Sequence, residues 1–176
     1  MYPTISIDFR YALGMNKQKK PINDMIEIFD ENENIPDEYF ILHLCSHFSE
    51  EARKSIDIFL CKDFNIIKLC DIRESIIKSL DLGECNLVEY AKKYFLQEEV
   101  YFALYYLYLV YEDSFVKEWL DQLEIDDPSL INKFGVLGHK MIDTFTKDVW
   151  QRMFSCYNLK DIKQMNNVIA HLTFDD

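Results

Sequence analysis

Two histidines on either side of a cysteine are the first residues of this chain whose spacing suggests chemistry. His43 and His47 stand four positions apart with Cys45 between them, so on a helix both imidazoles face one side and can share a metal ion. The zinc-peptidase pattern requires a Glu directly after the first His, whereas Leu44 stands there, and no third ligand follows at a suitable spacing. We therefore expect ordinary helix-surface histidines and no metal or other cofactor.

Segment 135–140, Gly-Val-Leu-Gly-His-Lys, is a second candidate because its backbone N–H groups could face a phosphate. Its glycines match neither the P-loop nor the dinucleotide-binding spacing, and no convincing strand precedes it. We interpret this segment as a turn between two helices.

Signatures of catalysis are missing from the sequence. No His is followed by Asp, no Arg stands a few residues ahead of a His, and no G-x-S-x-G is present. The five cysteines are odd in number and form no C-x-x-C pair, which indicates reduced, mostly buried thiols. These observations favour a protein that is not an enzyme.

The elements that position these residues are predicted to be helices. With only four Gly and four Pro, the chain lacks the turns that an all-β fold needs, and its apolar residues recur every three or four positions. We predict a mainly α, single-domain protein over residues 1–176, either an orthogonal bundle or stacked helical hairpins of eight or nine helices. The predicted helices are 21–34, 37–48, 49–60, 66–80, 86–95, 98–111, 114–123, 141–156 and 159–172, with a short helix at 128–134.

Two further patterns complete the predicted fold. Ile5, Ile7 and Phe9 alternate with polar residues, which indicates a short N-terminal strand or extended arm. The apolar run 100–111 is about a dozen residues long, whereas a membrane span needs roughly 20, so we expect a buried central helix and no membrane association. Charged residues precede any long apolar run, so we expect no signal peptide and a cytoplasmic location.

The charge of the chain is uneven. A formal net charge of −12 argues against nucleic acid and anionic membranes as partners, and is compatible with a basic protein. Between Pro21 and Ala52 there is no Lys or Arg, and in the stretch from Glu112 to Asp127 only Lys117 offsets the acids. Unbalanced like charge costs stability that a basic partner would restore. The competing interpretation is a solvated face that keeps the protein soluble.

Tyrosines and phenylalanines crowd the central apolar run. Aromatic side chains at helical spacing usually belong to the core, and we expect Tyr105 there. Because a helix does not bury every side, one or two of them are candidates for anchoring a partner, as Tyr often does at interfaces.

In its size, acidity and aromatic-rich helical pattern, the chain resembles the immunity proteins of bacterial contact-dependent growth inhibition. Its acidic runs at Asp24–Glu51 and Glu112–Asp127 carry this resemblance. The resemblance implies a cytoplasmic protein that neutralises a basic toxin enzyme, for which we expect a nuclease, by covering its active site with carboxylates. The predicted contact residues are Asp30, Glu31, Glu33, Asp37, Glu38, Glu112, Asp113 and Asp121.

An interaction protein of another class stays open as the alternative. A helical bundle resembling viral apoptosis regulators would receive a partner helix in an apolar groove instead of using an acidic face. The Asn-Trp-Gly-Arg groove motif and the C-terminal membrane anchor of that family are missing here.

Overall fold

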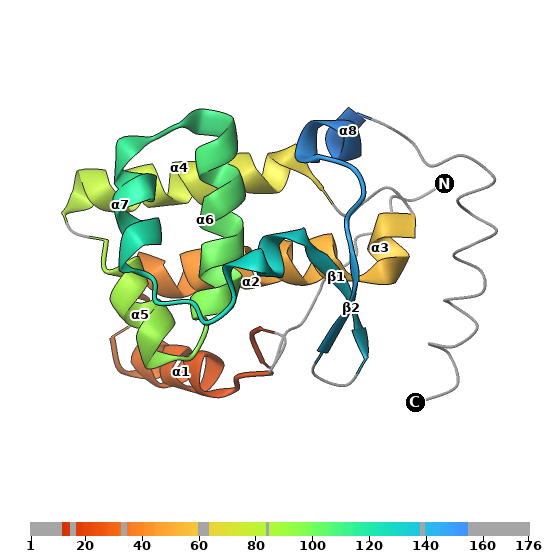
Figure 1. The fold of residues 1–176 in the computed structure, drawn as a ribbon. Coiled ribbons are helices and arrows are strands. Elements are labelled where there is room, and N and C mark those ends of the chain that lie inside the picture. The colour runs from red at the N-terminus through yellow and green to blue at the C-terminus, as the bar shows by residue number, and fades with distance from the viewer. Residues whose placement is uncertain are drawn as a thin grey trace, which may run out of the picture.

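The computed structural model describes residues 12–14, 17–32, 35–59, 64–83, 85–137 and 140–154 (Figure 1). Within these ranges the chain is mainly helical with one small antiparallel hairpin, which confirms the predicted fold class. The observed helices differ from the predicted ones in number and in some of their bounds. The N-terminal strand around Ile5 and the helix 159–172 lie outside the described residues.

The acidic segment without Lys or Arg forms two helices, α1 (Lys20–Asn32) and α2 (Asp37–Arg53). α2 runs through Ser49, where the sequence predicted that a second helix begins. Ser49 is buried, and the guanidinium group of Arg53 donates hydrogen bonds to its carbonyl and hydroxyl oxygens one turn back. The chain turns only at Lys54, and the short helix α3 (Ser55–Phe59) follows.

The next four helices follow the predicted segments closely: α4 (Ile66–Leu82), α5 (Leu87–Lys93), α6 (Gln97–Tyr111) and α7 (Ser114–Gln122). The Asn65 side chain accepts a hydrogen bond from the backbone N–H of Ile67 at 3.0 Å and so caps the start of α4. Gly83, at φ +155°, ends this helix in a conformation that side chains disfavour.

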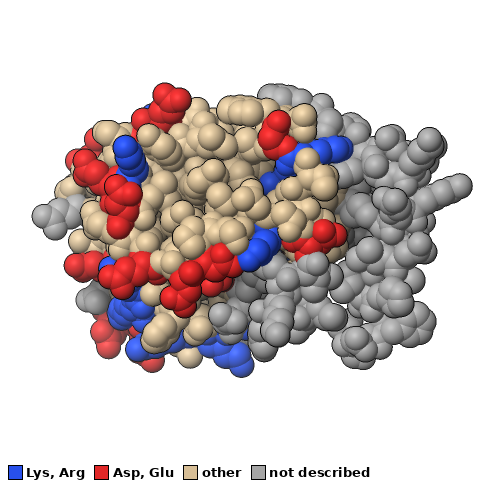
Figure 2. All heavy atoms as spheres, in the orientation of Figure 1, with Lys and Arg blue, Asp and Glu red and all other residues tan. Residues whose placement is uncertain are grey.

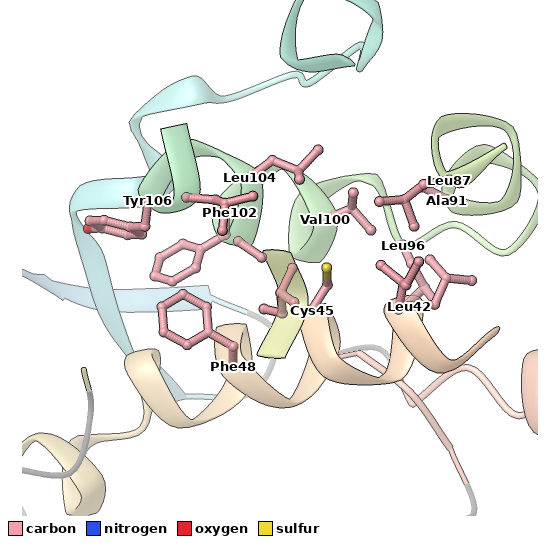
Figure 3. Close-up of a cluster of buried hydrophobic side chains, with 14 of the residues drawn as sticks. Leu42, Cys45, Phe48, Leu87, Ala91, Leu96, Val100, Phe102, Leu104 and Tyr106 are labelled. Carbon is pink, nitrogen blue, oxygen red and sulfur yellow. The ribbon is translucent and has the colours of Figure 1, made fainter. Parts of the chain in front are cut away.

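The core lies where α6 crosses α2 and α4 (Figure 1). In Figure 3, Cys45 and Phe48 of α2 point toward Val100 and Phe102 of α6. Helix α6 buries residues on several sides because α2, α4, α5 and α7 all pack against it. The prediction that this helix is the central core element is confirmed.

The region after α7 differs from the prediction. A 3-10 helix, η1 (Pro128–Asn132), leads into strand β1 (Lys133–Leu137), which pairs with β2 (Lys140–Thr144), and α8 covers only Val149–Phe154. The predicted short helix at 128–134 is present as η1, although it ends two residues earlier. The turn between helices at 135–140 is wrong, and so is the first part of the helix 141–156, where β2 lies instead. Gly135 has φ +71°, which a helix does not allow, and strand β1 packs against α2 and α3; both observations favour the hairpin over a helix.

Candidate protein-binding surface

An apolar pocket of 310 Å³ lies between α1 and the first half of α2. Asp37 and His43 supply its charged and titratable side chains. Its walls come from both helices and from the segments before each of them: Leu13, Pro21, Ile22, Met25, Ile35, Pro36, Asp37, Tyr39, Phe40 and His43. Apolar walls with a few polar groups are typical of binding sites.

Exposed apolar side chains extend this pocket along α1. The sequence placed Ile22, Met25, Ile26 and Phe29 on one helical face, and Ile22 and Met25 do line the pocket. Ile26 and Phe29, one turn further, are 51% and 52% exposed. An apolar stripe left in solvent beside a pocket is typical of an interaction site. We call the pocket together with Ile26 and Phe29 the α1–α2 groove.

Phe40 is the residue of the groove that sequence reasoning misplaced. The helical spacing of Phe40, Ile41, Leu44 and Phe48 in the sequence predicts one buried stripe, but Phe40 is 56% exposed, whereas Ile41 and Phe48 are fully buried. The buried face of α2 passes through Ile41, Cys45, Phe48 and Ala52. Phe40 lies at the edge of that buried face. Its four-residue spacing to Leu44 shows that the two side chains share one side of the helix, but not whether that side is at the centre or at the edge of the buried face.

Helix α1 is charged against its own dipole. It begins at Lys20, has no acidic residue in its first turn, and ends with Asp30 and Glu31 and no basic residue in its last turn. The N-terminus of a helix carries partial positive charge and the C-terminus partial negative charge, and each misplaced charge costs roughly 0.3–1 kcal/mol. A cation supplied from outside would therefore be stabilised at the end of α1.

The structure places the predicted acidic contact residues in different environments. Asp30 and Glu31 are exposed on α1, Asp37 lines the pocket, and Glu33 lies outside the described residues. Among the described residues, no Lys or Arg forms an ion pair with Asp30, Glu31 or Asp37. These three carboxylates are available to a partner.

Glu38 requires a correction. Its side chain is only 7% exposed, and a carboxylate oxygen accepts a hydrogen bond of 3.0 Å from the backbone N–H of Asn86 at the start of α5. A buried carboxylate that satisfies a helix terminus serves the fold. We therefore remove Glu38 from the candidate contact surface.

The second acidic stretch is partly neutralised as well. Glu112 and Asp121 are exposed, but Arg73 of α4 donates two hydrogen bonds to Asp113, at 2.7 and 3.2 Å. Lys133 approaches Asp127 to 2.5 Å, and its hydrogen bond, with help from Ser129, lowers the pKa of Asp127 to about 2. This stretch therefore offers fewer free carboxylates than its sequence indicates.

Similar pairing occurs within the first acidic run. Asp24 lies 3.7 Å from Lys93, Glu50 lies 3.8 Å from Lys54, and Glu51 pairs with Lys68. Figure 2 shows acidic side chains in several separate groups on one face, with Lys and Arg between some of them. The expectation of a wholly uncompensated acidic run is wrong for these residues, whereas Asp30, Glu31 and Asp37 have no Lys or Arg partner among the described residues.

A buried pair of tyrosines holds the two walls of the groove together. The hydroxyl groups of Tyr39 on α2 and Tyr94 after α5 are 2.6 Å apart, and Tyr94 also reaches Asp24 on α1. Burial, followed by the hydrogen bonds to Asp24 and Tyr39, raises the pKa of Tyr94 above its ordinary range. Tyr94 therefore stays protonated and can donate to the Asp24 carboxylate.

The histidine pair has structural contacts. His47 lies 2.6 Å from Glu51 through Nε2, and His43, with its ring centroid 6.0 Å from that of His47, lines the pocket. Cys45 points into the core, where burial and then the nearby Cys85 raise the pKa of its thiol. Across the described ranges, no three His, Cys, Asp or Glu side chains are grouped closely enough to hold a metal ion.

None of the described helices has the length and apolar character needed to cross a bilayer. Comparison with known protein families, curated proteins and solved structures found no match to this chain. The geometry of the α1–α2 groove is therefore the main guide to function.

Proposed function

We propose that this chain is a non-catalytic binding protein that neutralises a basic toxin enzyme in the cytoplasm, as immunity proteins do. The α1–α2 groove carries the proposal: it combines an apolar pocket, exposed aromatic side chains and nearby carboxylates that form no ion pair with any Lys or Arg in the described part of the chain. Apolar anchors supply affinity when water is excluded from them, and the surrounding charges supply specificity and fast association.

A nuclease is the toxin enzyme that this surface suits best. The active site of a nuclease binds phosphates with Lys and Arg, so it presents positive charge. Asp37 offers negative charge in the pocket, and Asp30 and Glu31 offer it at the exposed C-terminal end of α1. Covering the active site in this way needs no chemistry from the inhibitor itself.

The first test is co-expression in bacteria with basic nuclease domains, beginning with any toxin domain encoded next to the gene for this chain. We expect growth to be restored and a stable complex that weakens several-fold as ionic strength rises from about 0.05 to about 0.5 M, because screening shortens the range of charge attraction. Toxins that remain fully active in the presence of the folded chain would contradict an inhibitory role.

Two charge-reversal variants locate the contact. Asp30→Lys combined with Glu31→Lys changes α1, and Glu118→Lys combined with Glu124→Lys makes the matched change on α7 and just after it. All four side chains are exposed, so both variants should fold with unchanged helical circular dichroism. We expect only the α1 variant to lose protection. Full protection by the α1 variant would exclude the α1–α2 groove as the contact.

The pocket also favours a second candidate, an interaction protein that receives a partner helix in an apolar groove. Binding dominated by apolar contacts would persist at high salt, whereas binding to a toxin active site through carboxylates would not. The salt dependence of the complex therefore distinguishes the two functions.

A further inference from the structure

We infer that the α1–α2 groove takes a short basic amphipathic helix of the partner protein, with large apolar side chains in the pocket and Lys or Arg beside the end of α1. This inference rests on the proposed function for the existence of a protein partner. It adds the type of segment that binds and the way in which that segment lies in the groove.

The size and lining of the pocket determine what enters it. A cavity of about 150 Å³ holds one benzene molecule, so 310 Å³ accommodates about two ring-sized or branched aliphatic groups. Leu13, Ile22, Met25 and Ile35 supply the apolar surface, and Phe40 stands at the opening. The occupant must therefore carry one or two large apolar side chains.

The walls of the groove determine the backbone of the occupant. The two helices that form most of the groove hydrogen-bond their backbone groups internally, and Leu13 exchanges its backbone hydrogen bonds with Gln18, so none of these segments offers a strand edge for pairing. A segment that enters must satisfy its own N–H and C=O groups, as a helix does. Since α1 has 13 residues and is roughly 20 Å long, a partner helix of about 14 residues matches it.

Charge determines the sequence of that helix. Asp37 lines the pocket, and Asp30 and Glu31 stand at the negative end of the α1 dipole. No Lys or Arg occurs between Pro21 and Ala52 to oppose an incoming cation. Lys17 and Lys20 lie at the other end of α1, so the basic side chains of the bound helix are expected beside Asp30 and Glu31 at the C-terminal end of α1.

The probe for this inference is a fluorescein-labelled peptide of about 14 residues, designed as a helix with Leu and Phe on one face and Lys on the other. Two control peptides share its length. One has the same composition in a scrambled order without an apolar face, and the other has Glu in place of every Lys. Fluorescence anisotropy with the full chain gives the dissociation constants, and we expect only the basic amphipathic peptide to bind.

Phe40→Ala is the matched variant for the pocket. Phe40 is 56% exposed, so its removal should leave the fold intact while weakening peptide binding about tenfold, the usual scale for losing an aromatic anchor. Trp150→Ala is the control, because Trp150 is a comparably exposed aromatic residue, at 46%, on α8 at the opposite side of the fold (Figure 1). We expect this control to bind as the unchanged chain does.

Three results would overturn the inference: no binding of the basic amphipathic peptide, equal binding of the scrambled peptide, or equal affinity of the Phe40→Ala variant. If the chain still neutralises a toxin in that case, it is an inhibitor that binds its partner through a surface other than the α1–α2 groove. If the peptide binds the groove but no basic toxin is neutralised, the groove stands and the inhibitor proposal fails.

Discussion

Tyr94 donates a hydrogen bond from its hydroxyl group to Oδ2 of Asp24 at 2.6 Å, which joins the end of α5 to the middle of α1. The same hydroxyl oxygen is 2.6 Å from that of Tyr39 on α2. One buried side chain therefore connects three helices, two of which form the walls of the α1–α2 groove. The position of α1, and with it the shape of the groove, depends on this contact.

Tyr94→Phe tests that dependence. The variant loses a hydrogen bond to a charged group, which is worth roughly 1.5–3 kcal/mol, so we expect the free energy of unfolding in urea to fall by about 2 kcal/mol. Tyr90→Phe is the control, because the Tyr90 hydroxyl makes no hydrogen bond to another described residue and its ring packs edge-on against Tyr39. Equal stability of the two variants would show that the Asp24 contact contributes nothing.

Gly14→Ala should destabilise the protein for two reasons: the added Cβ atom meets neighbouring side chains, and the backbone conformation is one that alanine disfavours. A Cβ atom at Gly14 would lie 2.6 Å from Cδ2 of Leu96 and 2.7 Å from Oε1 of Glu99, and the residue has φ +73°. We expect a loss of roughly 2–4 kcal/mol from strain and overpacking together. Gly83→Ala is the comparison, since that site also has positive φ but no atom within 4 Å, so its loss should be smaller. Thermal unfolding of both variants measures the difference.

Tyr105→Ala and Tyr106→Ala separate two neighbours of the central helix. Tyr105 was predicted in the core but is only partly buried, whereas Tyr106 is 4% exposed and its hydroxyl donates a 2.7 Å hydrogen bond to the carbonyl of Ile131. Removing a buried ring costs roughly 3–5 kcal/mol, which is about 10 °C in melting temperature for a chain of this size. We expect Tyr106→Ala to reach that loss and Tyr105→Ala to stay well below it. A larger loss of melting temperature for Tyr105→Ala than for Tyr106→Ala would contradict the observed burial of these two side chains.

Stability should depend on pH through Glu51. Burial alone would raise its pKa, but hydrogen bonds and charge from Lys68 and His47 outweigh burial and lower it. A carboxyl group whose pKa is lower when folded stabilises the protein above its unfolded pKa, about 4.3, and loses this contribution as pH falls through the folded value. Lys68→Met should therefore cost about 1 kcal/mol at pH 7, since the pair is partly exposed.

The same comparison near pH 2.5 is the check on Glu51. Protonation of the folded carboxyl group removes its charge interaction with Lys68, so the stability difference between Lys68→Met and the unchanged chain should shrink as the pH falls toward this value. A difference of the same size at both pH values would mean that Lys68 acts through packing of its aliphatic chain instead of its charge.

The amino-acid sequence by itself determined the helices from residue 66 to residue 123 and the central place of 100–111. Local signals are sufficient there, because apolar residues recur at helical spacing, Asn65 caps the first helix and Gly83 ends it. The same spacing also predicted the apolar stripe of α1. The spacing of apolar residues along one helix determines which of them lie on the same side, and this depends only on the sequence of that helix.

Tertiary structure alone decided which face meets solvent and which charges are paired. Phe40 and Phe29 match their helical stripes but are 56% and 52% exposed, because helical spacing shows which residues share a face and not how much of that face a neighbour covers. Asp113 pairs with Arg73, which is 40 residues away, and a pairing over that distance leaves no periodic signal in the sequence. The hairpin at 133–144 likewise depends on contacts with α2 and α3, which override its local helical pattern.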